Sequence, residues 1–230
     1  PELPVIDDKK AVSYNLSSED FKHSVSQTVI AASNDSTRPI LTGVYWHSFE
    51  KNLYLAATDG YRLTERRIVA TKSDVEAVIP TSTLQEVLRT LRDDINEIEV
   101  LFDETQVTFR LAEVEITSRL IDGNFPDYRQ LIPSSTESSF TVNRSELMRI
   151  IKIAGLFARE SGGGITLNLD VDASRLTVHS IASEVGENSS ELEVKTNGQS
   201  GSVSLNSRYL TDALNAVTSD EVSFGFSGKL

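Results

Sequence analysis

Apolar residues recur at helical spacing behind short polar runs at four places, and neighbouring places are 63 residues apart. The first apolar residues at these places are Phe21, Leu84, Leu147 and Leu210. Four residues later come Val25, Leu88, Ile151 and Leu214, and three residues after those come Thr28, Leu91, Ala154 and Val217. An i, i+4, i+7 stripe behind Ser, Thr, Asn or Asp is typical of an amphipathic helix that follows an N-cap. The pattern therefore predicts four copies of one structural unit.

The helices are expected at residues 18–33, 82–92, 144–159 and 207–217, and the segments between them alternate apolar and polar residues. The alternating apolar positions include Val107, Phe109 and Leu111; Leu176 and Val178; Leu192 and Val194; Val203 and Leu205; and Val222, Phe224 and Phe226. Turn residues separate them at 59–60, 103–104, 172–174 and 197–198. Alternation of this kind predicts antiparallel strands with one solvent-exposed face.

Each unit is thus expected to be a strand, a helix and about three more strands, with two units side by side forming one α+β domain. Residues 122–133 fit neither period, and Pro126 and Pro133 disfavour both a helix and a central strand. We therefore expect an N-terminal linker at 1–10, one domain at 11–132 and a second at 133–230. The fourth unit reaches only its helix and one strand at 221–226, so we expect the second domain to lack its last strands.

The composition is typical of a soluble globular protein, with 39% hydrophobic and 24% charged residues and no cysteine. The absence of cysteine excludes disulfides and fits a cytoplasmic protein. The net charge is −12, but the four expected helices hold eight basic and five acidic residues. The eight are Lys22, Arg89, Arg92, Arg144, Arg149, Lys152, Arg159 and Arg208. Solvated helix faces would explain this bias, and so would a positive surface made by the helices within an acidic protein.

Motifs for catalysis are missing from the sequence. His23, His47 and His179 are far apart, with no spacing typical of metal ligands. The glycines at 162–164 are not followed by Lys and Ser or Thr, as a phosphate-binding loop requires. The carboxylates belong to no motif. We therefore expect neither an enzyme, nor a cofactor, nor a bound metal.

Five segments occur in the order known from one protein family. They are residues 38–44 (RPILTGV), 57–63 (ATDGYRL), 120–128 (LIDGNFPDY), 183–187 (SEVGE) and 206–214 (NSRYLTDAL). Together they resemble the bacterial sliding clamp, the beta subunit of DNA polymerase III. The resemblance implies the DNA-clamp fold, in which each of three similar domains is a tandem of two half-units. It also implies a head-to-tail homodimeric ring around double-stranded DNA. This chain resembles the second and third domains, so on its own it is expected to be a monomer.

The resemblance implies that the helices face DNA and contact its phosphates without reading the bases. The side chains expected to face DNA are Lys22, Arg38, Arg89, Arg92, Arg149 and Lys152, of which Arg38 ends a loop at 34–38. A weakly positive inner surface would let the ring slide along DNA, and encirclement rather than tight binding would hold it there.

The resemblance also implies a pocket between the second and third domains that binds short peptides of the DNA polymerase III catalytic subunit, the clamp loader and other clamp-binding proteins. The matching residues are Leu41, Thr58, Gly60, Tyr61, Arg62, Leu63, Pro133, Asn206, Tyr209 and Leu230. Apolar walls would hold the apolar side chains of the peptide, and Arg62 and Asn206 would hydrogen-bond its backbone. Tyr61 departs from the family, which often has His there, and Leu41 and Leu63 could equally pack a sheet.

Two other interpretations compete with a clamp. A β-rich protein-interaction module with a duplicated core and no role on DNA would show the same repeat. A hydrolase that uses carboxylates outside any motif is the third and weakest interpretation.

Overall fold

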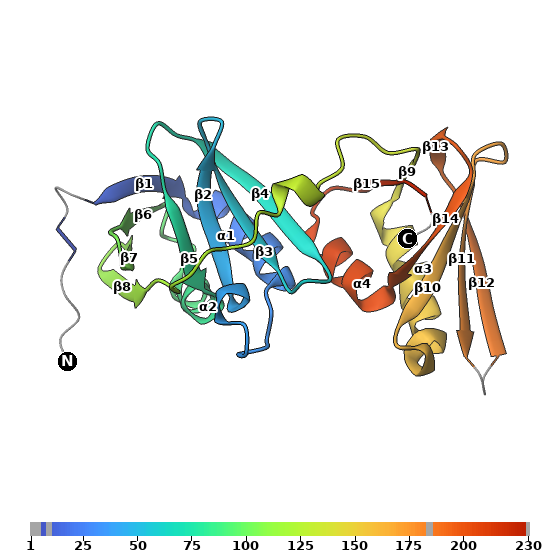
Figure 1. The fold of residues 1–230 in the computed structure, drawn as a ribbon, viewed down its shortest axis with the longest axis horizontal. Coiled ribbons are helices and arrows are strands. Elements are labelled where there is room, and N and C mark those ends of the chain that lie inside the picture. The colour runs from blue at the N-terminus through green and yellow to red at the C-terminus, as the bar shows by residue number, and fades with distance from the viewer. Residues whose placement is uncertain (1–5, 8–10, 183–185, 229–230) are drawn as a thin grey trace. The chain divides into compact units, whose positions relative to one another are not determined.

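The computed structural model describes residues 6–7, 11–182 and 186–228, in two compact units, Pro1–Tyr128 and Arg129–Leu230 (Figure 1). Unit 1 ends before the expected boundary at residue 132 because Tyr128 belongs to its interior. The Tyr128 side chain is buried, and its hydroxyl donates a hydrogen bond to Glu65 and lies 2.6 Å from Nε2 of His47. Most of the expected linker at residues 1–10 lies outside the described residues.

Unit 1 contains two consecutive repeats of a strand, a helix and three strands, as expected. The first repeat holds β1 (Val12–Ser17), α1 (Ser18–Thr28), β2 (Gly43–Phe49), β3 (Asn52–Thr58) and β4 (Leu63–Ala70), with short 3-10 turns η1 (Val29–Ala31) and η2 (Pro39–Thr42). The second repeat holds β5 (Glu76–Pro80), α2 (Thr81–Thr90), β6 (Glu97–Phe102), β7 (Gln106–Leu111) and β8 (Val114–Arg119).

The two repeats of unit 1 exchange strands. The sheet orders are β4-β3-β2-β5 and β1-β6-β7-β8, and all pairings are antiparallel. The strand before each helix therefore joins the sheet of the other repeat, as in the pairing of Gly43 in β2 with Pro80 in β5. Neither repeat forms a complete sheet from its own strands, so the half-units interlock, whereas the sequence predicted them only as neighbours.

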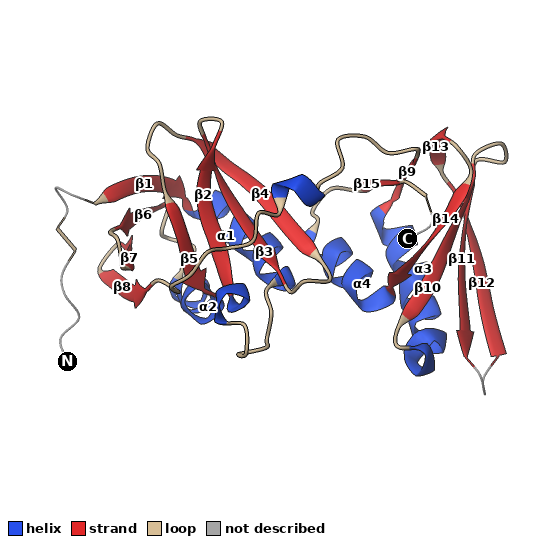
Figure 2. Cartoon of the chain, in the orientation of Figure 1, coloured by secondary structure: helices blue, strands red, loops and turns tan. Residues whose placement is uncertain are grey.

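Unit 2 follows the same plan. Its elements are η3 (Arg129–Leu131), β9 (Ser138–Asn143), α3 (Arg144–Phe157), η4 (Ala158–Ser161), β10 (Gly164–Asp170), β11 (Arg175–Ala182), β12 (Gly186–Glu193), β13 (Lys195–Gly198), β14 (Gly201–Asn206), α4 (Ser207–Ala216) and β15 (Glu221–Phe226). The sheets are β12-β11-β10-β14 and β13-β9-β15. The strands before α3 and α4 are exchanged between repeats here as well. Figure 2 shows α3 and α4 on the same side of the sheet that contains β10 and β11.

Three of the helices begin with a side-chain cap, as the polar runs predict. The side-chain oxygens of Ser17, Asn143 and Asn206 accept hydrogen bonds from backbone amides in the first turns of α1, α3 and α4. The helix α2 differs, because Pro80 is its N-cap and makes no such bond. Thr81, expected in the cap, is the first helical residue and donates its hydroxyl to the carbonyl oxygen of Thr42 at 2.7 Å.

Several expected boundaries are wrong. The helix expected at 18–33 ends at Thr28, whose hydroxyl is buried and donates to the carbonyl oxygen of Ser24 at 2.6 Å. The helix expected to reach residue 92 ends at Thr90, so Arg92 lies beyond it. Val194 separates β12 from β13, and Gly198 is the last residue of β13 and not part of the turn. Periodicity fixes which face of an element is buried but does not locate its ends.

Each unit has its own hydrophobic core, and the residues that begin the four stripes are all buried. In unit 1 Phe21 contacts the rings of Trp46 and Phe109, at centroid distances of 6.2 and 5.8 Å. In unit 2 Leu147 and Ile151 belong to the same core as the sheet residues Ile165, Leu167 and Leu176. Within the described residues, no helix is both long enough and apolar enough to cross a membrane.

Candidate functional site

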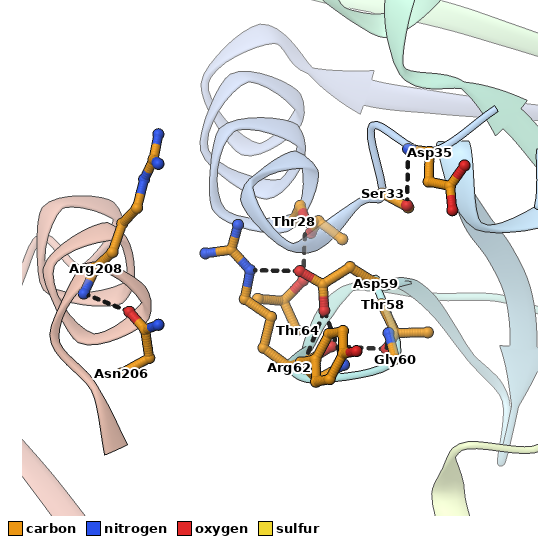
Figure 3. Close-up of polar contacts among 11 residues, drawn as sticks. Thr28, Ser33, Asp35, Thr58, Asp59, Gly60, Arg62, Thr64, Asn206 and Arg208 are labelled. Carbon is orange, nitrogen blue, oxygen red and sulfur yellow. Dashed lines mark hydrogen bonds and ion pairs between the residues drawn. The ribbon is translucent and has the colours of Figure 1, made fainter. Parts of the chain in front are cut away.

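The loop between β3 and β4 carries three of the residues expected to bind peptides, Gly60, Tyr61 and Arg62, and hydrogen bonds hold it in shape (Figure 3). The hydroxyl of Thr58 donates to the carbonyl oxygen of Arg62 at 2.6 Å and accepts from the amide of Gly60 at 3.0 Å. One carboxylate oxygen of Asp59 accepts from the amides of Tyr61 and Arg62, and the other lies 3.1 Å from Nε of Arg62. Hydrogen bonds within the turn therefore stabilise its conformation without a ligand.

The side chains in and next to this loop differ in how much of each is exposed to solvent. Tyr61 is 86% exposed, so its ring is available to a partner. The Arg62 side chain is only 23% exposed and is oriented by Asp59. Leu63 at the start of β4 is partly buried, and Leu41 in η2 is 6% exposed. Leu41 is therefore buried within unit 1 and offers little surface to a partner.

Arg38, expected to face DNA, lies beside this loop. Gly60 has φ = +92°, and a Cβ atom added there would lie 3.7 Å from Nη1 of Arg38. Arg38 is exposed. Hydrogen bonds from the backbone and side chain of Thr37 lower the pKa of Asp35 below its usual value, and the charge of Arg38 adds to this effect. The structure therefore brings Arg38 close to a residue of the peptide-binding set.

In unit 2, Asn206 is the N-cap of α4 and Tyr209 lies in its first turn. Oδ1 of Asn206 accepts from the amide of Arg208 at 2.9 Å, and Nδ2 donates to the carbonyl oxygen of Gly162 at 3.3 Å. A Cβ atom on Gly163 would come within 3.3 Å of the same amide group. Asn206 is therefore first of all a helix cap, with one amide hydrogen remaining for a ligand. Tyr209 is partly buried.

Two apolar residues next to Pro133 were missed in the sequence. Leu131 is 76% exposed and Ile132 is 42% exposed, and Pro133 itself is exposed. Adjacent large apolar side chains left in solvent are typical of a contact surface. The available signal was an apolar pair in a segment that follows neither the helical nor the strand period. Leu230 lies outside the described residues.

Two of the basic residues expected to face DNA line one cavity of unit 1. Lys22 of α1 and Arg92, just past the end of α2, both line a cavity of about 440 Å³, together with His23. Ser18 at the start of α1 also lines it, and no hydrogen bond to its buried Oγ occurs among the described residues. The acids Glu19 and Asp93 line the same cavity, so the charges of Lys22 and Arg92 are balanced there. His23 was not among the expected DNA-facing residues.

The cations on and around the helices are not equally available. Arg89 pairs with Glu86 at 2.5 Å and Arg92 pairs with Asp94 at 3.1 Å, both on the surface. Arg144 belongs to the structure of unit 2, because its Nη1 donates to the carbonyl oxygen of Leu214 at 3.2 Å near the end of α4. The excess positive charge of the helices is therefore smaller in effect than their composition indicates.

Among the described residues, Arg149 and Lys152 form the clearest pair of exposed cations on one helix. They lie three residues apart on α3 and are both exposed. The buried residues of the same helix are Leu147, Ile150, Ile151 and Ala154. Side chains three positions apart lie on the same side of a helix, so the two cations share one exposed surface.

The described residues hold no group of three or more His, Cys, Asp or Glu side chains that could bind a metal. His47 is buried against Tyr128, and His179 lies 3.4 Å from Glu187 on a neighbouring strand. The histidines thus lie in separate places.

Two protein-family models match this chain. One describes the central domain of the DNA polymerase III beta subunit and matches residues 15–127, and the other describes its C-terminal domain and matches residues 129–230. The curated "Beta sliding clamp" of Staphylococcus aureus is 32% identical over 233 residues, which cover 100% of this chain and 61% of the relative. The chain therefore spans less than two thirds of the length of that relative.

Solved structures agree with the family models. The Bacillus subtilis DNA polymerase sliding clamp superimposes with a TM-score of 0.91 at 31% identity, over 100% of this chain and 61% of the other. The beta subunit of the Streptococcus pyogenes DNA polymerase gives a TM-score of 0.91 at 28% identity, over 99% of this chain and 62% of the other. The DNA-clamp fold expected from the sequence is confirmed. From its two matched domains and its fold, this chain belongs to the family of the DNA polymerase III beta subunit, the bacterial sliding clamp.

Proposed function

We propose that this protein acts in DNA replication as a processivity clamp, a non-catalytic subunit of the polymerase holoenzyme in the cytoplasm. In this proposal it encircles double-stranded DNA as part of a head-to-tail homodimeric ring. It tethers the DNA polymerase III catalytic subunit and recruits the clamp loader and other proteins through short peptides. The observation that carries the proposal is the match of two consecutive clamp domains along the chain.

Contact with DNA is proposed for the basic side chains of the helices and for Arg38. Lys22 and Arg92 at one cavity, and Arg149 and Lys152 on one helix, offer cations that can contact phosphates. Such a surface binds phosphates independently of sequence. An overall charge of −12 keeps the attraction weak, which suits a protein that slides.

Reversing the two cations of α3 is expected to weaken binding to DNA. With the double variant Arg149→Glu/Lys152→Glu, the affinity for a fluorescein-labelled 20-base-pair duplex should fall about tenfold at low salt. The slope of log K against log[salt] should become shallower by about 2, because two phosphate contacts are lost. Fluorescence anisotropy over a salt series measures both quantities.

The matched control is Arg175→Glu/Lys195→Glu, which changes the net charge equally but lies on strands of the same unit. Both control residues already pair with acids, Glu191 and Glu221. If the control weakens binding as much as the α3 variant, net charge alone explains the effect and the proposed DNA-facing role of α3 is wrong.

Peptide binding is proposed separately for the β3–β4 loop and for the start of α4. Tyr61 offers an exposed ring, Arg62 is oriented by Asp59, and Asn206 keeps one amide hydrogen for a ligand. Aromatic and arginine side chains held in place before binding are typical of residues that contribute strongly to affinity. Leu63, Pro133 and Tyr209 would add apolar contact, and Leu131 and Ile132 join this set.

Removing the exposed ring is expected to weaken peptide binding without loss of stability. For Tyr61→Ala, the Kd of a short labelled peptide rich in Gln and Leu should rise about tenfold, as measured by fluorescence polarisation. Arg62→Ala and Tyr209→Ala should act in the same direction. The control Ile181→Ala removes an exposed apolar side chain of β11 and should leave Kd unchanged. Equal affinity of all four variants would contradict the assignment.

The β-rich interaction module with no role on DNA remains the second candidate. Its support is the exposed apolar pair Leu131 and Ile132, which needs a protein partner but no nucleic acid. The module predicts that both charge-reversal variants bind DNA as weakly as the unaltered chain.

A further inference from the structure

The segment that leaves β8 crosses between the two sheets of unit 1, and we call residues 120–128 the strap. The amide of Leu120 donates to the carbonyl oxygen of Thr105 in the β6–β7 turn at 2.9 Å. The next amide, of Ile121, donates to the carbonyl oxygen of Val78 in β5 at 2.8 Å. Figure 1 shows the strap running from β8 across β5 and β2. The strap is therefore fixed to both interlocked repeats at once.

A groove of about 450 Å³ lies where the strap meets β5, and we call it the strap groove. One wall is β5, which is an edge strand of its sheet. The other sides are closed by residues 104–105 of the β6–β7 turn, Gln106 at the start of β7, Arg119 at the end of β8 and residues 120–123 of the strap. All of these residues belong to unit 1. None of them is among the residues proposed above to bind DNA or linear peptides.

Phe125 supplies the aromatic face of the strap groove, because the Tyr45 ring is stacked between Phe125 and His47, with the His47 centroid 4.6 Å away at an interplanar angle of 14°. The rings of Phe125 and Tyr45 are nearly parallel, with centroids 4.8 Å apart and an interplanar angle of 11°. Phe125 meets the edge of Tyr128 at 6.3 Å, and Tyr128 is held by His47 and Glu65. The hydroxyl of Tyr128 donates to Glu65, so the His47 ring nitrogen donates to that hydroxyl. This anchoring keeps the aromatic surface in place without a ligand.

Acidic side chains dominate the rim of the groove. Glu76, Glu104 and Asp122 line it and are exposed, against a single lining cation, Arg119. Excess negative charge around a concave site raises the local concentration of cationic groups.

The raised pKa of Tyr45 is consistent with the excess negative charge around the groove. Burial raises the pKa of the Tyr45 phenol well above its ordinary value, and the carboxylates of Glu76 and Asp127 raise it further. The phenol therefore stays protonated and donates to Oε1 of Glu76 at 3.0 Å. One oxygen of that carboxylate is engaged by this bond, and the other remains for a ligand.

We propose that the strap groove binds an arginine side chain presented by an extended segment of a partner protein. A guanidinium group stacks on aromatic faces and forms paired hydrogen bonds with carboxylates, whereas the ammonium group of lysine is a compact, strongly hydrated charge. The half-buried ring of Phe125 offers the first contact and the rim acids Glu76 and Asp122 the second.

The test uses the 230-residue chain and the labelled pentapeptide acetyl-Gly-Arg-Gly-Arg-Gly-amide at about 0.15 M salt. The comparison peptide carries citrulline at both arginine positions, which keeps the shape and removes the charge. We expect saturable anisotropy for the arginine peptide, and a Kd at least tenfold higher for the citrulline peptide. The variant Glu76→Gln/Asp122→Asn should weaken arginine-peptide binding about tenfold. Phe125→Leu, which keeps an apolar side chain but removes the ring, should weaken it about threefold.

The control variant Glu113→Gln/Asp172→Asn makes the same change in net charge at exposed acids outside the groove. Its Kd should stay within twofold of the unaltered chain, and a loss as large as that of Glu76→Gln/Asp122→Asn would overturn the proposal, since any acidic surface would then suffice. The absence of saturable binding would overturn it as well.

A second copy of this chain is the competing occupant. A dimer in sedimentation that Glu76→Gln/Asp122→Asn dissociates, with no peptide binding, would assign the groove to self-association. The test involves neither DNA nor a Gln- and Leu-rich peptide, so it is independent of the proposed clamp function.

Discussion

Phe21→Ala is expected to lower the free energy of unfolding by about 3–5 kcal/mol, because it empties a fully buried site in the core of unit 1. Phe21 begins the first helical stripe and contacts the rings of Trp46 and Phe109. These neighbours belong to strands of different repeats, β2 and β7, so the cavity would open between both sheets. Urea unfolding followed by fluorescence measures the loss directly, since Trp46 is the single tryptophan of the sequence and lies in this core.

The neighbouring exposed residue supplies the control for Phe21. Lys22→Ala removes a side chain of similar length from the solvent side of the same helix, and its effect should stay within about 0.5 kcal/mol. If both variants lower the free energy of unfolding by the same small amount, the stripe that begins at Phe21 does not stabilise the core.

Gly198→Ala is expected to lower the free energy of unfolding by about 2–5 kcal/mol, because it strains the backbone of unit 2. Gly198 ends β13 with φ = +91°, a conformation that a Cβ atom disfavours. A Cβ atom there would lie 2.0 Å from the carbonyl oxygen of Glu137, and that oxygen accepts the amide of Gln199. The substitution therefore has to displace the backbone that joins β13 to β9. Urea unfolding followed by far-UV circular dichroism measures the cost.

Gly162→Ala separates the two causes of this cost. Gly162 also has a positive φ, +69°, but a Cβ atom there meets nothing within 4 Å among the described residues. Only the conformational penalty applies, so Gly162→Ala should lower the free energy of unfolding by about 1 kcal/mol. Equal losses at the two glycines would show that the contact with Glu137 does not determine the cost at Gly198.

The helices and their buried faces could be predicted from the sequence because the signal is local. Four stripes in register, headed by Phe21, Leu84, Leu147 and Leu210, place one buried face on each helix, and all four residues are buried. The polar runs before three of the helices predict their caps for the same reason. The ends were less predictable, because a stripe continues through a 3-10 turn such as η1 without a change of polarity.

The exchange of strands between repeats could not be predicted in this way. Alternation in a strand such as β11 shows which side of the strand is buried, but it carries no information on which strand lies beside it. The pairing of β2 with β5, and of β1 with β6, depends on contacts distant in sequence. The spacing of the repeats gave their number, and only the structure gives their connection.

The candidate sites were predicted from segments that match the family, and the structure changes the part that individual residues can play. Arg144 was counted among the helix cations, but its contact with the carbonyl oxygen of Leu214 makes it structural. Arg92 lies beyond its helix and still lines a cavity with Lys22. The exposure of Leu131 and Ile132 was not predicted, because they follow the family segment that ends at Tyr128 and belong to neither the helical nor the strand period.

The exchange of strands also bears on how such a protein can arise. A single repeat, made alone, would hold three strands of one sheet and a fourth strand with no partner in its own chain. Two separate copies could satisfy each other only by trading that strand, which is domain swapping between identical molecules. Fusion of the two copies into one polypeptide would make the trade intramolecular and independent of protein concentration. Any cut between the repeats of unit 1 should therefore yield pieces that assemble with each other before either becomes stable.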